Sequence, residues 1–228
     1  MLQHKKRQKN YFKDNLMLLF KIILLISTSS ISMLNYAKTN IELNQYHNHI
    51  KVKSWKSIRD TNIVKQDLDY SCGSASIATI LNGYFQKNVT EKEILDIINK
   101  GDSMASFEDM QRALNNLGFE NKGYAVSIDT LKKLKIPVII YIKHRNNDHF
   151  TVISGINDNF IRISDSSFGQ RILSIQQFKD IWETRKDDKF RGKILVVFPN
   201  NHSINQKFFS KKIKQPTIQI IKFMISRN

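Results

Sequence analysis

The sequence predicts an α+β fold in which N-terminal helices pack on a C-terminal antiparallel sheet. Two patterns along the chain support this fold class. Between residues 72 and 134, apolar residues recur at the three- and four-residue spacing of helices, whereas after residue 136 short β-branched runs alternate with polar turns. The length of 228 residues and the hydrophobic content of 41% allow one ordinary domain with extensions.

Helix signals dominate the first half of this domain. Ser71 is a candidate N-cap directly before an apolar pattern, and Cys72 would then lie in the first turn of the helix. Thr90 and Glu93 form a capping-box pattern before a second helix. The helices are expected over about residues 72–85, 90–99, 107–117 and 128–134.

Strand signals follow from Pro137 onward. Polar residues at 157–159 separate two apolar runs, which favours a hairpin with its turn at that point. The strands are expected over residues 137–142, 149–156, 159–165, 170–174 and 193–198, with a short helix over 176–183 that Ser174 would cap.

Residues 1–37 have the layout of an export signal or a membrane anchor. A basic stretch precedes the apolar run LMLLFKIILLIS at residues 16–27. This run is shorter than the roughly 20 residues of an ordinary span, and Lys21 interrupts it. A translation start at Met17 would make Lys21 the basic region of a shorter signal. We therefore expect an exported protein, periplasmic or membrane-tethered, with a cytosolic extension as the alternative.

Three further segments complete the expected organisation. Residues 38–61 form an arm with one candidate strand, and residues 62–199 form the compact domain. Residues 200–228 form a basic tail that contains the run IQIIKFMI. For this tail a surface helix, a membrane-associating strip and a solvated extension are alternatives.

The net charge of +16 does not indicate a nucleic-acid partner, because most of it lies at the two ends. Residues 1–37 contain six basic residues and one acid, and residues 200–228 contain six basic residues and no acid, so only +5 remains for the middle. In the middle, acids and bases alternate, and no nucleic-acid-binding motif occurs. We expect no nucleic-acid partner.

Cys72 is the single cysteine, so an internal disulfide is excluded. A helix N-terminus offers free backbone N–H groups and a positive dipole end, both of which stabilise a thiolate. Cys72 is therefore a candidate nucleophile. Small apolar residues surround it, and a buried cysteine without chemistry is the alternative.

His149 is the candidate base for this thiol. It begins the apolar run HFTVISGI, which should hold its backbone rigidly, whereas His144 lies in a polar turn. Asp165 ends the next strand, and in a hairpin centred on residue 157 the two residues lie opposite each other, within reach of a carboxylate–imidazole hydrogen bond. Asp148 is the poorer orienting group, because adjacent strand residues point to opposite faces.

Gln66 lies six residues before Cys72, in the segment that leads into the helix. Its amide is a candidate donor, together with the backbone N–H of Cys72, to the oxyanion of a tetrahedral intermediate. An exposed loop glutamine without chemistry is the alternative.

The order Gln66, Cys72, His149, Asp165 resembles that of the C39 cysteine peptidases, the papain-like domains that process bacteriocin precursors. The resemblance rests on QDLDYSCGSASIATIL, HFTVISGI and DSSFG, and it covers about residues 62–199. It implies a papain-like α+β fold. It also implies that the four residues act as oxyanion donor, nucleophile, base and orienting group, in that order.

The chain departs from this family at several points. Many members have Asp before the cysteine and Pro after the aspartate, where this chain has Ser71 and Ser166, and neither position is expected to carry the chemistry. The well-known members are domains of ABC exporters, but the chain contains no GxxxxGK[ST] phosphate loop. We therefore expect a stand-alone form.

The resemblance implies a cysteine endopeptidase whose partner is a peptide or protein substrate, with cleavage after a Gly-Gly leader as the family's activity. No cofactor or metal is expected, because the histidines and acids lack ligand spacings such as HxxxH. Two alternatives use the same cleft. One is a catalytically silent module that binds a leader peptide or a partner protein, and the other is a transferase or amidase.

Overall fold

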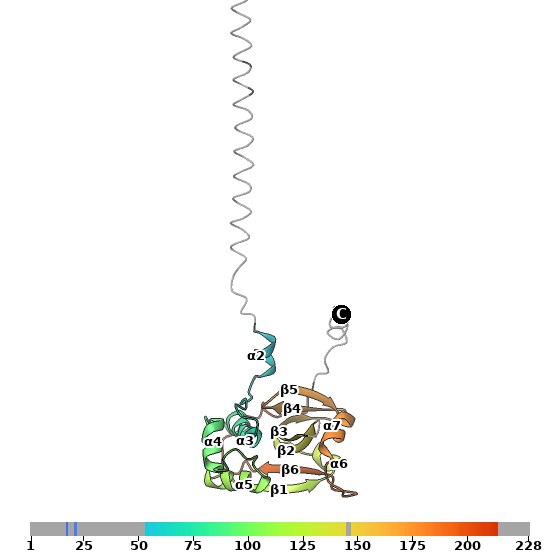
Figure 1. The fold of residues 1–228 in the computed structure, drawn as a ribbon. Coiled ribbons are helices and arrows are strands. Elements are labelled where there is room, and N and C mark those ends of the chain that lie inside the picture. The colour runs from blue at the N-terminus through green and yellow to red at the C-terminus, as the bar shows by residue number, and fades with distance from the viewer. Residues whose placement is uncertain (1–16, 18–20, 22–52, 145–146, 214–228) are drawn as a thin grey trace, which may run out of the picture. The chain divides into compact units, whose positions relative to one another are not determined.

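The computed structural model describes Met17, Lys21, residues 53–144 and residues 147–213 (Figure 1). All the elements named below belong to the unit Lys53–Asn228. The predicted export signal lies outside the described residues except for Met17 and Lys21, which are both exposed. No helix among the residues that the structure describes is long and apolar enough to span a bilayer.

The elements follow the predicted order, helices first and sheet second. The helices are α2 (Trp55–Arg59), α3 (Cys72–Gly83), α4 (Glu91–Ile98), α5 (Phe107–Asn116), α6 (Ile128–Lys132) and α7 (Ile175–Trp182). The strands are β1 (Asn121–Val126), β2 (Val138–His144), β3 (Asn147–Ile156), β4 (Phe160–Asp165), β5 (Gly169–Ser174) and β6 (Gly192–Val197). The helices and strands predicted for residues 62–199 are therefore confirmed to within a few residues, and β1 and α2 are additional.

The strands form one six-stranded sheet in the order β1-β6-β2-β3-β4-β5, with all neighbours antiparallel. Helices α3, α4 and α5 gather at one side of the sheet, and α6 and α7 lie at the other (Figure 1). The core accordingly divides in two: Ile139 and Leu195 pack with α3, whereas Ile140 and Ile194 pack with α7. Because side chains on both faces of β2 are buried from Val138 to Ile140, this part of its sequence is apolar instead of alternating.

Three helices begin with complete capping boxes. The predicted box of Thr90 and Glu93 is confirmed at α4, and Ser106 and Ser174 cap α5 and α7 in the same way. Ser71 is the N-cap residue of α3, as predicted, but its side chain makes no capping bond to the helix. The hydroxyl instead donates to the carbonyl of Leu68 (2.7 Å) and accepts from the Leu68 N–H (3.2 Å), so it closes the turn before the helix.

The expected strand of the N-terminal arm is also not found in the described part of that arm. Residues 55–59 form helix α2, whose N-cap Ser54 accepts a hydrogen bond from the N–H of Ser57. Serine is a preferred N-cap residue, so Ser54 was a signal in the sequence for a helix that begins at Trp55. Residues 38–52 of the arm lie outside the described residues.

Residues 200–213, the first part of the expected basic tail, pack on the domain. Phe208 is 6% exposed, and a Cβ atom added to Gly83 would lie 2.2 Å from its ring. Asn205 is bound to the same region by two hydrogen bonds. Its backbone N–H donates to the carbonyl of Tyr84 (2.7 Å), and its side-chain amide donates to the carbonyl of Gly83 (3.1 Å). This C-terminal strap, residues 205–210, covers the end of α3. The IQIIKFMI run lies outside the described residues.

Candidate active site

Cys72 is the first residue of α3, and only 1% of it is exposed. Small residues follow it and let the helix lie close to its neighbours: a Cβ on Gly73 would already approach Ala105 and Met110 to 3.3 Å. As the first residue of the helix, Cys72 has a backbone N–H without an intrahelical acceptor. The sulfur is therefore fixed at a helix N-terminus.

His149 lies on β3 with its Nε2 atom 3.2 Å from Oδ1 of Asp165 at the end of β4. The expected contact between these two side chains is thus confirmed, although the expected register is wrong. The ladder pairs Val152 with Ser164 and Ile153 with Ile163, which places Asp165 diagonal to His149 instead of opposite it.

The physical reason for this register is the centre of the turn, which lies between Asp158 and Asn159, since Ile156 pairs with Ile161. A bulge at Ser154 then changes the pairing by one residue, from Gly155–Arg162 to Ile153–Ile163. The turn is formed by the polar residues 157–159 that the sequence indicated, and the side chain of Asn157 accepts from the N–H groups of Asn159 (3.0 Å) and Phe160 (2.8 Å). Diagonal residues on one face stay within reach of long or aromatic side chains, so the imidazole still meets the carboxylate.

The His149–Asp165 pair is buried, with the His149 side chain 12% exposed and that of Asp165 0% exposed. Burial lowers the pKa of His149, but hydrogen bonds with Asp165 and Cys72 outweigh it and raise the pKa to about 9. Burial also raises the pKa of Asp165, and the hydrogen bond with His149 outweighs it, so that the pKa lies below its usual value. With a pKa of about 9, the ring is mostly protonated at neutral pH, and it lies next to the sulfur of Cys72.

Asp165 is held by the turn that follows it. Its Oδ1 accepts the backbone N–H groups of Ser167 (2.9 Å) and Phe168 (3.0 Å) as well as the bond from His149. Three donors on one oxygen fix the carboxylate and hence the plane of the ring. Nε2 is occupied by Asp165, so Nδ1 is the ring nitrogen left for the thiol.

Gln66 joins this turn from the other side. Its side-chain oxygen accepts from the hydroxyls of Ser166 (2.8 Å) and Ser167 (2.7 Å), and its Nε2 donates to the carbonyl of Leu68 (2.9 Å). The sequence indicated Gln66 but missed both serines, and Ser166 in particular was not expected to contribute. A polar residue directly after the orienting aspartate was the only signal available.

A cavity of about 730 Å³ lies over the site, and Gln66 and His149 both line it. Its other lining residues are Asp69, Met104, Lys143, Asn147, Asp148, Ser167 and Phe168. Cys72 and Asp165 are not among the lining residues, because both are almost entirely buried. The structure thus places His149 between the cavity and the two buried groups that it contacts.

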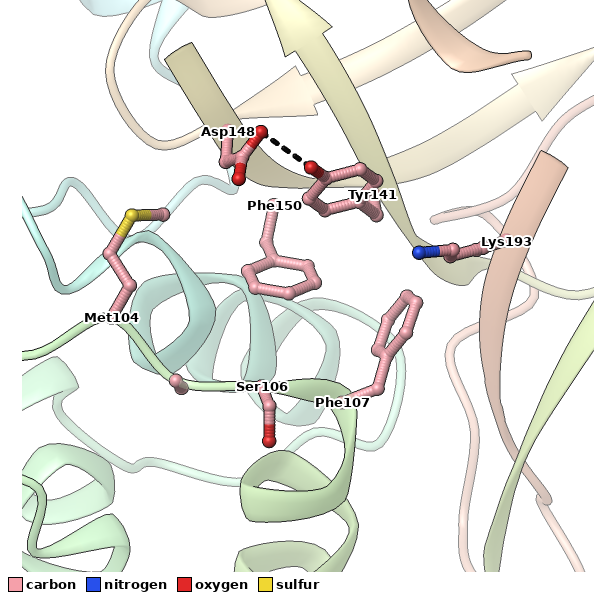
Figure 2. A pocket seen from close by; sticks show the side chains of 8 residues that line it. Met104, Ser106, Phe107, Tyr141, Asp148, Phe150 and Lys193 are labelled. Atoms are coloured by element: carbon pink, nitrogen blue, oxygen red, sulfur yellow. Dashed lines mark hydrogen bonds between the residues drawn. The ribbon is translucent and has the colours of Figure 1, made fainter. Parts of the chain in front are cut away.

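A second, smaller cavity of about 240 Å³ shares Met104 and Asp148 with the first (Figure 2). Phe107 and Phe150 form much of its wall, with their ring centroids 5.0 Å apart. At its rim the hydroxyl of Tyr141 donates to Asp148 (2.5 Å) (Figure 2). Asp148 is thereby engaged with Tyr141, in agreement with its expected unsuitability as the orienting group.

No group of three or more His, Cys, Asp or Glu side chains that could hold a metal ion occurs among the described residues. The site brings together the thiol of Cys72, the imidazole of His149, the carboxylate of Asp165 and the amide of Gln66. This set, held by a helix N-terminus and two neighbouring strands, is that of the papain-like cysteine peptidases.

The chain belongs to the peptidase C39 family, whose model matches residues 60–186. The chain is 32% identical over 139 residues to a probable functional amyloid protease, FapD, of Pseudomonas fluorescens, and the match covers 58% of this chain and 62% of that relative. The chain thus spans less than two thirds of that relative's length.

Solved structures show the same fold. The peptidase domain of Streptococcus ComA, a bifunctional ABC transporter of a quorum-sensing pathway, superimposes with a TM-score of 0.51 at 19% identity, over 59% of this chain and 96% of that domain. A double-glycine-motif protease from an AMS/PCAT transporter, solved with its leader peptide, gives a TM-score of 0.50 at 24% identity, over 59% and 89%. These likenesses establish the papain-like α+β architecture predicted from the sequence.

Proposed function

We propose that this protein is a cysteine endopeptidase that cleaves a peptide bond after a Gly-Gly leader. The observation that carries the proposal is the contact of a nearly buried thiol with a charged imidazole. Cys72 is 1% exposed and raises the pKa of His149, whose ring faces the large cavity. A sulfur so enclosed favours an acyl group without a side chain, which is glycine.

The reaction follows from these positions. The Cys72 thiolate attacks the peptide carbonyl carbon, and the oxyanion accepts hydrogen bonds from the Cys72 N–H and the Gln66 amide. His149 donates its proton to the leaving nitrogen as the C–N bond breaks, which leaves a thioester. Water then attacks the thioester while His149 takes up its proton, and the thiolate is released. Asp165 keeps the ring in place throughout.

The smaller cavity is a candidate for an apolar side chain of the substrate. It adjoins the large cavity at Met104 and Asp148, and Phe107 and Phe150 make its wall apolar. We propose that it receives a residue a short distance before the glycines. The name of the Pseudomonas relative makes proteins of an amyloid-forming system suitable first candidates as substrates.

The test is cleavage of synthetic peptides containing Gly-Gly by the full-length protein, analysed by mass spectrometry. Cleavage must disappear in Cys72→Ala and in His149→Ala, and it must fall when either glycine is replaced by valine. His202→Ala is the matched control, because that ring stacks on Phe119 (4.4 Å between centroids) outside the site. Binding without cleavage would favour the silent module, and unchanged cleavage by Cys72→Ala would exclude the mechanism.

We also propose that residues 1–37 export the protein or tether it to a membrane. The basic stretch and the apolar run at residues 16–27 support this proposal. Cell fractionation combined with sequencing of the mature N-terminus tests it. A new N-terminus after Ser29, Ser30 or Ala37 is the expected result for a cleaved signal, and intact Met1 in cytosolic protein would contradict export.

A further inference from the structure

We propose that Ser166 is a positioning residue that, with help from Ser167, fixes the Gln66 amide for the oxyanion. This inference rests on the proposed function and extends it to a residue outside the four-residue set. Two hydroxyls converge on the Gln66 oxygen at 2.8 and 2.7 Å, and the backbone N–H of Gln66 also donates to the carbonyl of Ser166 (3.3 Å).

The contacts on the two ends of the amide determine its orientation. Serine hydroxyls can donate to the oxygen end, whereas the Leu68 carbonyl, at 2.9 Å from the nitrogen end, can only accept. A rotated amide would place its oxygen against the Leu68 carbonyl and lose that bond. The observed orientation leaves the second Nε2 hydrogen of Gln66, which lines the large cavity, for the oxyanion.

Burial separates the two serines. Ser166 is 1% exposed, whereas Ser167 is exposed to solvent. Water can replace the Ser167 hydroxyl when it is removed, but the Ser166 hydroxyl has no such substitute. The larger part of the positioning is therefore assigned to Ser166. Many family members have proline at this position, and because proline has no hydroxyl those members lack this contact.

Ser166 follows Asp165 directly, and an effect through Asp165 and His149 must therefore be separated from an effect through Gln66. Alkylation of Cys72 by iodoacetamide makes this separation. It needs a thiolate and hence His149, but it forms no oxyanion. Hydrolysis needs the thiolate and also stabilisation of the oxyanion. A residue that acts through Gln66 should change hydrolysis and leave alkylation as it is.

The experiment measures both reactions in the full chain, with a peptide ending in Gly-Gly-aminomethylcoumarin as the hydrolysis probe. Gln66→Ala should lower kcat by about 100- to 1000-fold. Ser166→Ala should lower kcat by about tenfold with KM and the alkylation rate within about twofold, and Ser166→Thr should recover most of the loss. Ser164→Ala is the matched control, because that buried hydroxyl of β4 donates to Ser154 (2.8 Å) on the neighbouring strand β3 and not to Gln66.

The decisive comparison is a double-mutant cycle. In a Gln66→Ala background, Ser166→Ala should cause no further loss of kcat. An equal loss in both backgrounds, an equal slowing of alkylation, or a kcat like that of the parent would each overturn the inference. If circular dichroism shows that Ser166→Ala does not fold, the same cycle is measured with Ser167→Ala, whose serine is exposed. The smaller loss of kcat expected for Ser167→Ala must then be absent in the Gln66→Ala background.

The two proposals fail in different ways. If the parent does not hydrolyse the probe, or if Cys72→Ala hydrolyses it as well as the parent, the proposed function fails and the inference fails with it. If Cys72→Ala abolishes hydrolysis while Ser166→Ala equals the parent, only the inference fails.

Discussion

His149 and Asp165 are joined by a hydrogen bond of 3.2 Å although they are not opposite each other in their hairpin. The turn is centred between Asp158 and Asn159 and the bulge at Ser154 changes the pairing by one residue, so the imidazole spans a diagonal of the ladder. The contact therefore depends on the reach of the imidazole and on the two backbone N–H groups that hold the carboxylate.

Replacement of Asp165 should act mainly through the charge of His149. Asp165→Asn keeps an acceptor for the ring but removes the negative charge that raises the pKa of His149, so this pKa should fall below about 9. Peptide cleavage at neutral pH should fall by roughly 100- to 10,000-fold, the contribution of an oriented acid–base group. Histidine titration by NMR and cleavage rates measure the two effects. Asp148→Asn is the matched control, and an unchanged His149 titration in Asp165→Asn would contradict the assignment.

The same pair should make stability depend on pH. The folded-state pKa of His149, about 9, is above its ordinary value of 6.5, so its contribution is complete below pH 6.5 and is lost as the pH rises through 9. Denaturant unfolding at pH 6.5 and 9.5 should show the advantage of the parent over His149→Gln shrinking by on the order of 3 kcal/mol. A difference that is constant over this range would refute the linkage. His202→Gln provides the comparison for loss of a ring elsewhere.

Gly83→Ala should destabilise the domain, although alanine normally favours a helix. The added Cβ would lie 2.2 Å from the Phe208 ring, and overpacking of this kind costs about 1–3 kcal/mol. Gly123→Ala is the control, since its nearest heavy atom would be 3.7 Å away, and it should stay within about 0.5 kcal/mol. In a Phe208→Ala background the penalty of Gly83→Ala should disappear. A persistent penalty would mean that the C-terminal strap is not its cause.

Phe107→Ala should affect recognition more than chemistry. Phe107 lines the smaller cavity and packs on Phe150, but no interaction joins it to Cys72 or His149. For a peptide with an apolar residue before the glycines, KM should rise about 10-fold or more while kcat changes little. Phe190→Ala removes an exposed ring outside both cavities and should leave KM unchanged. An equal rise of KM in the two variants would argue against the subsite.

The sequence predicted those parts of the molecule that depend on periodicity and short-range geometry. The order Cys72, His149, Asp165 and the turn near residue 157 were enough to bring base and carboxylate together, because a hairpin brings the two ends of its segment to one place. The exact register was not predictable, since the polar residues 157–159 allow more than one turn centre, and the bulge at Ser154, which the C-terminal strap contacts, has no local signal in the sequence. Ser210 of the strap donates its N–H to the Ser154 carbonyl (3.1 Å).

The elements that the sequence missed had weak local signals. In β1 only Val126 is buried, so the strand has no alternation to detect, and its partner β6 comes more than 60 residues later. Phe208 and Phe209 stand among polar and basic residues, and only the tertiary fold shows that they are buried. Ser166 appears in the sequence as an ordinary polar turn residue, because its hydroxyl finds Gln66 only across a separation of 100 positions.

The C-terminal strap has a consequence for biosynthesis. The helix that begins with Cys72 is covered at its other end by residues 205–210, which the ribosome makes after every strand of the sheet. In a nascent chain β2, β3 and β4 can pair earlier. Gly83 can pack on Phe208, and the carbonyl of Tyr84 can accept from Asn205, only after residue 208 has left the ribosome. We therefore expect α3 to reach its final packing late, so that a chain still being synthesised would contain Cys72, His149 and Asp165 before the helix that carries Cys72 is fully packed.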